Sequence, residues 1–274
     1  MELTNDNYYS MESNMYYCSV SQYKSFIGTP SNPACEAAAM ADLRGEIEHK
    51  AVSTALLVGS YVDAYYSGEF DQFIDEHPEI FRMNGTLKAA FKQANTMIAR
   101  SKKDALFQRY MEGDKQLILT GDIEGVPFKV KIDSTDHKRI TDLKTVRKIS
   151  ETFFVKDSGE RITFIEKWNY DLQAAIYQEI YFQNYGKRLP FYICAVDKSR
   201  SSIDGSFHPR IAVIQIPQSA IDDRLAEVRH NVRRIEMLKT GEIEPIACGV
   251  CDYCADTLPL TRPISVDELL TEVE

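Results

Sequence analysis

Hydrophobic and polar residues alternate most regularly in the middle of the chain, which predicts a pair of strands. Residues 126–133 have the period of a strand with one face on the core and one toward solvent. The apolar positions are Val126, Phe128, Val130 and Ile132, and the polar ones are Lys129, Lys131 and Asp133. An earlier strand is predicted at about 115–123, and Glu124-Gly125 form a tight turn, so the unit is predicted to be an antiparallel meander.

A third strand is predicted to follow, with polar residues on one side. Ile140, Asp142 and Lys144 share that side, because residues two apart in a strand point the same way. A simple antiparallel register places Asp133 opposite residues nearer 139 than 142. A twist or bulge is therefore expected to bring Asp133 and Asp142 together.

Helical spacing dominates the residues before the meander. The first 18 residues lack periodicity and are expected to form an arm or a loose segment. Helices are predicted from Ser19 or Ser21 to about Ile27, from near Ala34 to Gly45, and over 51–66, 71–76 and 86–110.

Helices and strands are mixed after the meander. An irregular stretch is expected over 149–166 and a helix over 168–184. Residues 191–196 and 211–216 are strand-like and are expected to extend the sheet. Apolar spacing then predicts an amphipathic helix over 218–239. The pattern predicts an α/β (α+β) fold, with a central mixed sheet flanked by helices and a helical N-terminal region.

Length and composition favour one domain. The 274 residues are 44% hydrophobic, enough for one sizeable core. A single domain 1–274 is predicted, with a mainly helical part (1–110), a sheet-containing part (111–240) and a Cys-rich tail (241–274). Neither a membrane-spanning apolar run nor a basic or apolar leader is seen, so the expected location is cytoplasmic, with no membrane partner.

Charge is distributed unevenly along the chain. A net charge of −9 argues against a protein that coats nucleic acid. Residues 129–148 reverse this balance, with seven basic residues against three acidic ones. A local basic groove near the meander is one interpretation, and a solvated surface with several lysines is the other.

Asp133, Asp142 and Lys144 have the chemistry of a metal-dependent phosphodiesterase. Hydrolysis of a phosphodiester needs an activated water and neutralisation of the charge that develops on phosphate, and a divalent metal supplies both. Magnesium prefers oxygen ligands, so Asp133 and Asp142, with the backbone carbonyl of Leu143, are candidate ligands. Lys144 could hold or activate the attacking water and offset negative charge.

Four motifs surround and include these residues in a fixed order. They are Gly59-Ser-Tyr-Val-Asp63, Asp133, Asp142-Leu-Lys144 and Gln173-Ala-Ala-Ile-Tyr177. In this order they resemble the motifs of the PD-(D/E)xK nuclease superfamily and, within it, the RecB-like exonucleases. The phage and prophage exodeoxyribonuclease VIII (RecE-like) nuclease family is the nearest resemblance.

The resemblance implies a restriction-endonuclease-like core and a DNA exonuclease that depends on Mg²⁺ or Mn²⁺. It implies hydrolysis at linear duplex ends in phage-type recombination or repair, with a single-strand annealing protein as partner and a homo-oligomeric assembly. The implied catalytic residues are Asp133, Asp142, Lys144, Gln173 and Tyr177. The implied metal ligands are Asp63, Asp133, Asp142 and the backbone carbonyl of Leu143.

One departure from the family pattern leaves a second function open. RecB-like members usually carry His at the last position of the first motif, where this chain has Asp63. Asp is also an oxygen ligand for magnesium, but the metal geometry would change. The alternative is a catalytically inactive DNA-end-binding or assembly module of the same fold.

Six cysteines form the second candidate constellation. Cys248, Cys251 and Cys254 lie close together, and Cys35 resembles the N-terminal cysteine of iron-sulfur members of the superfamily. Cys18 is the second candidate for a fourth ligand, and Cys194 is expected in the core. The spacing leaves three alternatives open, which are a [4Fe–4S] cluster, Zn²⁺ and a knuckle without metal. A redox or structural protein that carries a cluster is a further, weaker interpretation.

Overall fold

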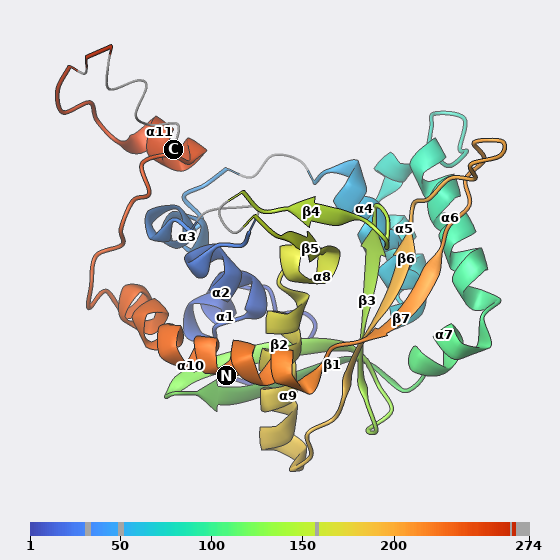
Figure 1. The fold of residues 1–274 in the computed structure, drawn as a ribbon, viewed down its shortest axis with the longest axis horizontal. Helices are drawn as coiled ribbons and strands as arrows, with labels where there is room; N and C mark the ends of the chain where they lie inside the picture. Colours follow the sequence, from blue (N-terminus) through green and yellow to red (C-terminus); the bar gives the residue numbers. More distant parts are fainter. Residues whose placement is uncertain (31–33, 49–51, 157–158, 264, 267–274) are drawn as a thin grey trace.

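The centre of the protein is a five-stranded mixed sheet with the order β1-β2-β3-β6-β7. The computed structural model describes residues 1–30, 34–48, 52–156, 159–263 and 265–266. The strands are β1 (Asp114–Ile123), β2 (Val126–Thr135), β3 (Ile140–Val146), β6 (Phe191–Asp197) and β7 (Ile211–Gln215). Strands β3 and β6 are parallel, and the other neighbouring pairs are antiparallel (Figure 1). The predicted fold class is therefore confirmed.

The turn between β1 and β2 sets the first part of the sheet. Glu124 and Gly125 have φ values of 53° and 83°, as required in a two-residue hairpin turn whose twist matches that of the strands. The Asp122 carboxylate accepts a hydrogen bond of 2.7 Å from the Gly125 N–H. Ile123 then pairs with Val126, so the predicted turn is confirmed.

The register of β2 against β3 differs from the prediction. Ser134 pairs with Thr141 and Thr135 with Ile140. The regular pairing ends one residue before Asp133 and Asp142, so this register leads the two residues toward each other. The sequence-based register centred the turn near residue 136, whereas the turn occupies 136–139 and is centred one to two residues later. Its shape depends on Asp136, whose carboxylate accepts from the Lys138 and Arg139 N–H groups at 3.0 Å each.

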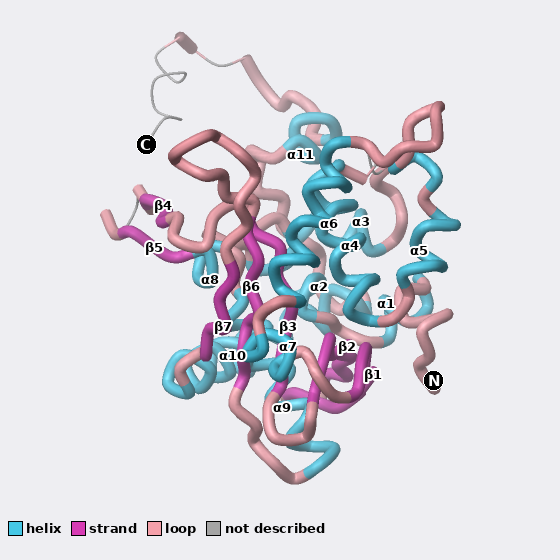
Figure 2. The backbone as a smooth tube through the Cα atoms, turned by 90° about the vertical axis from the view of Figure 1, so that its right-hand side faces the viewer, coloured by secondary structure: helices cyan, strands magenta, loops and turns pink. Residues whose placement is uncertain are grey.

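Two layers of helices cover the two faces of the sheet. On one face lie α4 (Thr54–Ser67), α5 (Phe70–Glu76), η1 (Pro78–Ile80), α6 (Ala89–Lys102) and α7 (Ala105–Tyr110). On the other lie α2 (Val20–Ile27), α3 (Glu36–Leu43), α9 (Tyr170–Tyr185) and α10 (Gln218–Thr240). Figure 2 shows α4 and α6 to one side of β6 and most of α10 to the other. Alternate residues of β6 enter different cores, which explains its nearly continuous apolar sequence.

The N-terminal segment is ordered, and the prediction of a loose arm was wrong. Helix α1 (Met11–Tyr16) begins at Ser10, whose side chain caps it. This segment covers the polar face of β2, where Lys129 is only 1% exposed. The Lys129 ammonium donates to the Tyr8 carbonyl, to Ser13 Oγ at 2.9 Å and to Asn14 Oδ1 at 2.7 Å. Three acceptors thus compensate the burial of a charge that the alternation had placed toward solvent.

The stretch after β3 also contains more structure than expected. Strands β4 (Thr152–Phe154) and β5 (Arg161–Thr163) form a separate two-stranded sheet. Helix α8 (Phe164–Lys167) follows, and Thr163 and Glu166 form a capping box at its start. The two strands are too short to show a hydrophobic period, so the prediction of an irregular stretch was wrong.

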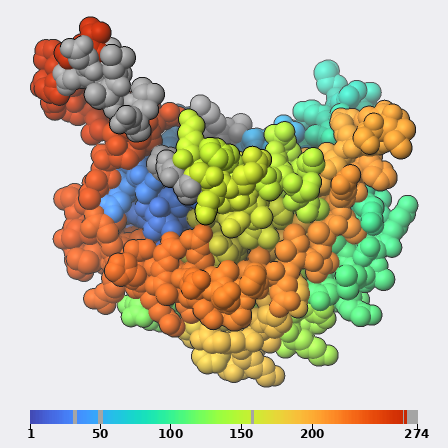
Figure 3. All heavy atoms as spheres, in the orientation of Figure 1, coloured from blue at the N-terminus to red at the C-terminus, as the bar shows by residue number. Residues whose placement is uncertain are grey.

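The C-terminal segment returns to the N-terminal part of the chain. After α10, the short helix α11 (Asp252–Thr257) contacts α3, and this segment stands out from the main body of the protein (Figure 3). Within the described part of the chain, no helix combines the length and the apolar character needed to cross a bilayer.

Gly113→Ala tests the tight start of β1. Gly113 has a φ of 108°, and a Cβ there would overlap the backbone carbonyl of Thr135. Because backbone strain and overpacking act together, we expect the free energy of unfolding to fall by about 2–4 kcal/mol. Urea denaturation measures this change. Gly186→Ala is the matched control, because Gly186 also has a positive φ, of 69°, but the added Cβ would have no non-neighbouring atom within 4 Å. An equal loss in both variants would show that the overlap has no effect.

Candidate active site

The six side chains predicted for the site line one cleft of about 680 Å³. They come from four elements that are distant in sequence. Helix α4 contributes Asp63, strand β2 contributes Asp133, strand β3 contributes Asp142 and Lys144, and helix α9 contributes Gln173 and Tyr177. The structure therefore brings together the six side chains that the four motifs contribute to the predicted site.

Strands β2 and β3 fix the two central carboxylates. Asp133 Oδ2 accepts a 2.8 Å hydrogen bond from the Leu143 backbone N–H, beyond the last regular pair of the two strands. Asp142 is only 2% exposed. The Lys144 ammonium lies 2.6 Å from Asp142 Oδ2. The Asp133 side chain thus takes the place of a backbone acceptor where the regular pairing ends, and both carboxylates line the cleft.

Helix α9 holds Asp142 and β2 from the other side of the cleft. Gln173 Nε2 donates to Asp142 Oδ1 at 2.6 Å. The Tyr177 hydroxyl, one helical turn later, donates to the Lys131 carbonyl at 3.0 Å. Because both bonds leave the same face of α9, the helix fixes the orientation of the Asp142 carboxylate relative to β2.

Helix α4 approaches β3 closely at Gly59. A Cβ at this position would lie 3.2 Å from Thr145 Oγ1, tighter than ordinary van der Waals contact. One helical turn later, Asp63 reaches the cleft, where Gln116 Nε2 lies 3.5 Å from its Oδ2. The glycine of the first motif therefore permits the close packing that places Asp63 beside the sheet carboxylates.

The three carboxylates are strongly coupled electrostatically. Burial, followed by the charge of Asp142, raises the pKa of Asp63 to about 6. The same two causes raise the pKa of Asp133 well above its ordinary value. Burial disfavours the ammonium form of Lys144, but Asp142 and Asp133 outweigh burial and raise its pKa. A site of this kind attracts positive charge.

The sequence prediction missed Tyr170 and Lys24. The Tyr170 ring lies 4.8 Å from the Lys144 ammonium and 5.3 Å from that of Lys24. Lys24 donates to the Trp168 carbonyl at 2.7 Å, and burial together with the charge of Lys144 lowers its pKa to about 8. Tyr170 precedes Gln173 by three residues and shares its helix face, which was a usable signal. Lys24 lies far away in sequence and gave none.

The local excess of basic residues is less available than the count suggested. Lys129 is buried beneath the N-terminal segment, and Arg139 pairs with Asp136 at 2.6 Å. Lys144 is paired with Asp142. Lys131 does line the cleft, 5.8 Å from the Tyr9 ring. Two of the seven basic residues are thus paired with carboxylates and a third is buried, so the predicted local basic groove has fewer free charges than the count suggested.

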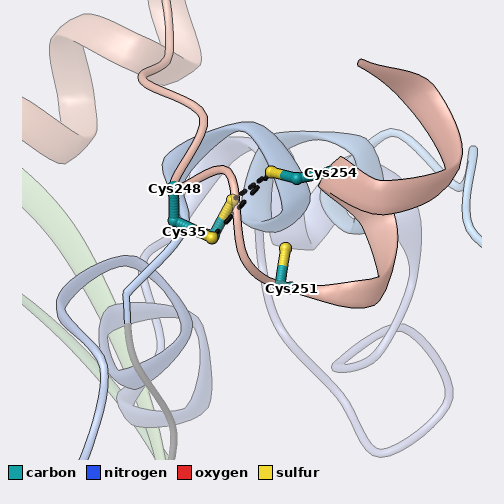
Figure 4. A group of neighbouring side chains, drawn as sticks. All are labelled: Cys35, Cys248, Cys251 and Cys254. Atoms are coloured by element: carbon teal, nitrogen blue, oxygen red, sulfur yellow. Dashed lines mark hydrogen bonds between the residues drawn. The ribbon is translucent and has the colours of Figure 1, made fainter. Parts of the chain in front are cut away.

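Four cysteines form a second cluster, away from the cleft. The Sγ atoms of Cys35, Cys248, Cys251 and Cys254 all lie within 4.8 Å of one another, pointing to a common centre (Figure 4). Cys18 is not among them. It is buried beside β2, and burial raises its pKa to about 12. Cys194 is buried in β6, as expected for a core residue.

Comparisons with known proteins agree with this fold. A family model described as "PDDEXK-like domain of unknown function (DUF3799)" matches residues 19–257. The crystal structure named "Putative exonuclease" from Eubacterium rectale is 43% identical, covers 100% of both chains and has a TM-score of 0.91. A crystal structure of SSO0001 is 14% identical over 88% of this chain and 100% of that one, and its TM-score of 0.29 carries no argument. No curated protein matches.

Replacing Asp63 by Asn should stabilise the metal-free protein at neutral pH. With its pKa raised from 3.8 to about 6, Asp63 binds its proton more tightly in the folded state. This tighter proton binding stabilises the folded state. The contribution is fully present below about pH 4 and is lost as the pH rises through about 6. We expect Asp63→Asn to gain about 1–3 kcal/mol at pH 7 and almost nothing at pH 4.

Urea denaturation in a chelating buffer between pH 4 and pH 7 measures this difference. Asp75→Asn, at an exposed position of α5, is the matched control and should follow the wild type at every pH. A gain for Asp63→Asn that does not change with pH would contradict the electrostatic origin.

Proposed function

The chain belongs to the family of PDDEXK-like domains, and from this premise we propose that it is a divalent-metal-dependent DNA exonuclease acting at duplex ends. The observation that carries the proposal is the convergence of Asp63, Asp133, Asp142 and Lys144 in one cleft. The name of the 43% identical relative, an exonuclease, supports the same class of activity. Residues 1–274 would act as a single domain, because elements from both ends of the chain pack on one sheet.

The donor atoms in the cleft fit a hard divalent cation. Burial and the charge of Asp142 raise the pKa values of Asp63 and Asp133, so bound positive charge would favour the ionised carboxylates. Among the described residues, only the four cysteines form a closely convergent set of His, Cys, Asp and Glu ligands. The cleft carboxylates do not lie that close together, and magnesium is the best match to them because it keeps several waters and needs few protein ligands.

Asp63, Asp133, Asp142 and the Leu143 carbonyl would hold Mg²⁺ or Mn²⁺. When bound, the metal supplies positive charge to the phosphate and lowers the pKa of water. Lys144 would donate to a phosphate oxygen or to the attacking water and offset the charge that develops.

Gln173 and Tyr177 would act by positioning. The Gln173 hydrogen bond holds one oxygen of the Asp142 carboxylate, so that the other oxygen faces Lys144. Tyr177 ties α9 to the backbone of β2 two residues before Asp133, so the helix and the strand keep their separation. DNA would enter through the cleft, with Lys131 and Lys24 at its walls to attract the phosphate backbone.

The biological process and the partners of the protein are part of the same proposal. The resemblance to phage and prophage nucleases suggests recombination or repair, with a single-strand annealing protein as partner and a homo-oligomer as the working form. The competing proposal is an inactive module that binds DNA ends. The observation that favours it is Asp63 at the position where RecB-like members usually carry His.

Linear duplex DNA with Mg²⁺ provides the direct test. We expect the wild type to release nucleotides, and Asp133→Ala and Lys144→Ala to lower the rate by at least about 10²–10³-fold, because each removes a group that acts on the developing charge. Asp75→Ala and Lys138→Ala, both at exposed positions outside the cleft, are the matched controls and should keep wild-type rates.

The substrate form separates the alternatives. An exonuclease should digest linear duplex and leave covalently closed circular duplex intact. Cleavage of the circle would show that the protein is an endonuclease and not an exonuclease. Tight binding of linear DNA, with no release under Mg²⁺ or Mn²⁺, would establish the inactive end-binding module instead.

A further inference from the structure

The cysteine cluster has dimensions that discriminate between metals. The Sγ atoms of Cys35 and Cys254 are 3.6 Å apart, and those of Cys248 and Cys254 are 3.9 Å apart. All four Sγ atoms, including that of Cys251, lie within 4.8 Å of one another. The four sulfur atoms are therefore compactly arranged.

A single tetrahedral ion fits this spacing. Zinc–sulfur bonds are about 2.3 Å long, so tetrahedral geometry separates neighbouring sulfurs by about 3.8 Å. Both shorter separations in the cluster are close to that value. In a [4Fe–4S] cluster each cysteine binds a different iron, and bridging sulfides lie between the irons, so the four thiolates stand around a much larger body. Four thiols this close together leave no room for it.

We propose that Cys35, Cys248, Cys251 and Cys254 bind one Zn²⁺ as a structural site, and that the iron-sulfur cluster implied by the family resemblance does not form in this chain. Binding makes four sulfur–zinc bonds and releases the thiol protons to solvent, with no change of oxidation state.

The backbone builds the site from two short helical turns and one tight loop. Cys35 is the N-cap of α3, and its Sγ accepts from the Ala38 N–H at 3.4 Å. Cys251 is the N-cap of α11, and Cys254 lies three residues later on the same face. Gly249 has a φ of 78°, which lets the chain turn so that Cys248 faces the other thiols.

The site would stabilise one wall of the cleft from outside. Helix α3 begins at Cys35 and lines the cleft through Ala39, Asp42 and Leu43. Its start is also tied to the C-terminal segment by polar contacts. Glu36 accepts from Arg234 Nη2 at 2.8 Å and from the Ile246 N–H at 2.9 Å. Zinc would thus add to an existing connection between the two ends of the chain, without touching the carboxylates.

Metal analysis of the full-length protein, purified without oxygen and without added metal, tests the proposal. We expect about one zinc per chain, no acid-labile sulfide and no visible absorbance. Exchange of zinc for Co²⁺ should give the visible bands of tetrahedral cobalt thiolate. About four irons and four sulfides per chain would overturn the proposal, and so would a disulfide between any two of these cysteines, or protein that contains no metal.

Cys251→Ser is the informative variant, because Cys251 is only partly buried and its loss leaves the core intact. We expect its zinc content to fall to below about a tenth per chain and its Tm to fall by on the order of 10 °C. Cys194→Ala removes a thiol outside the cluster and should keep full zinc content. If Cys251→Ser does not fold, the cobalt spectrum of the wild type still decides the question. None of these measurements depends on nuclease activity, so they remain valid if the proposed function is wrong.

Discussion

The structure depends on the pairing of β2 with β3, because this register leads to the two central carboxylates. The last regular pair is Ser134 with Thr141, and beyond it the Leu143 N–H donates to the carboxylate of Asp133, next to the buried Asp142. Burial and the charge of Asp142 raise the pKa of Asp133, so its ionised form costs free energy that the rest of the fold must offset. Such a cost is common at functional sites, where an arrangement is kept for what it binds.

The surrounding elements act as supports for that pair. Gly59 lets α4 pack against β3 and bring Asp63 to the cleft, while Gln173 fixes one oxygen of Asp142 from the opposite side. Lys144 places an ammonium against the other oxygen. Each support comes from a different element, so the site forms only when both helical layers are docked on the sheet.

The two ends of the chain complete the same wall. The N-terminal segment covers β2 through the buried Lys129, and the C-terminal segment meets α3 at the cysteine cluster. Arg234 and Glu36 connect α10 with α3 beside that cluster. The position of the cleft wall thus depends on contacts between residues that are 115 to 219 positions apart, which adds to the long-range contacts on which the site depends.

The sequence by itself determined most of the long elements and the candidate chemistry, because alternation and helical spacing are local and because carboxylate, lysine and thiol side chains carry their chemistry with them. The β1–β2 turn, the buried β6 strand and the long α10 helix were all predicted in this way, whereas the short elements α1, β4 and β5 were not. Tertiary structure alone decided the register that leads β2 and β3 to Asp133 and Asp142, the burial of Lys129, and the approach of Lys24 to Tyr170. These three features depend on turn geometry and on contacts between distant segments. The local hydrophobic period of a sequence contains no information about either. The spacing of the four thiols was likewise decided by the tertiary structure, since the sequence identifies the candidate ligands but only the fold sets the distances between them.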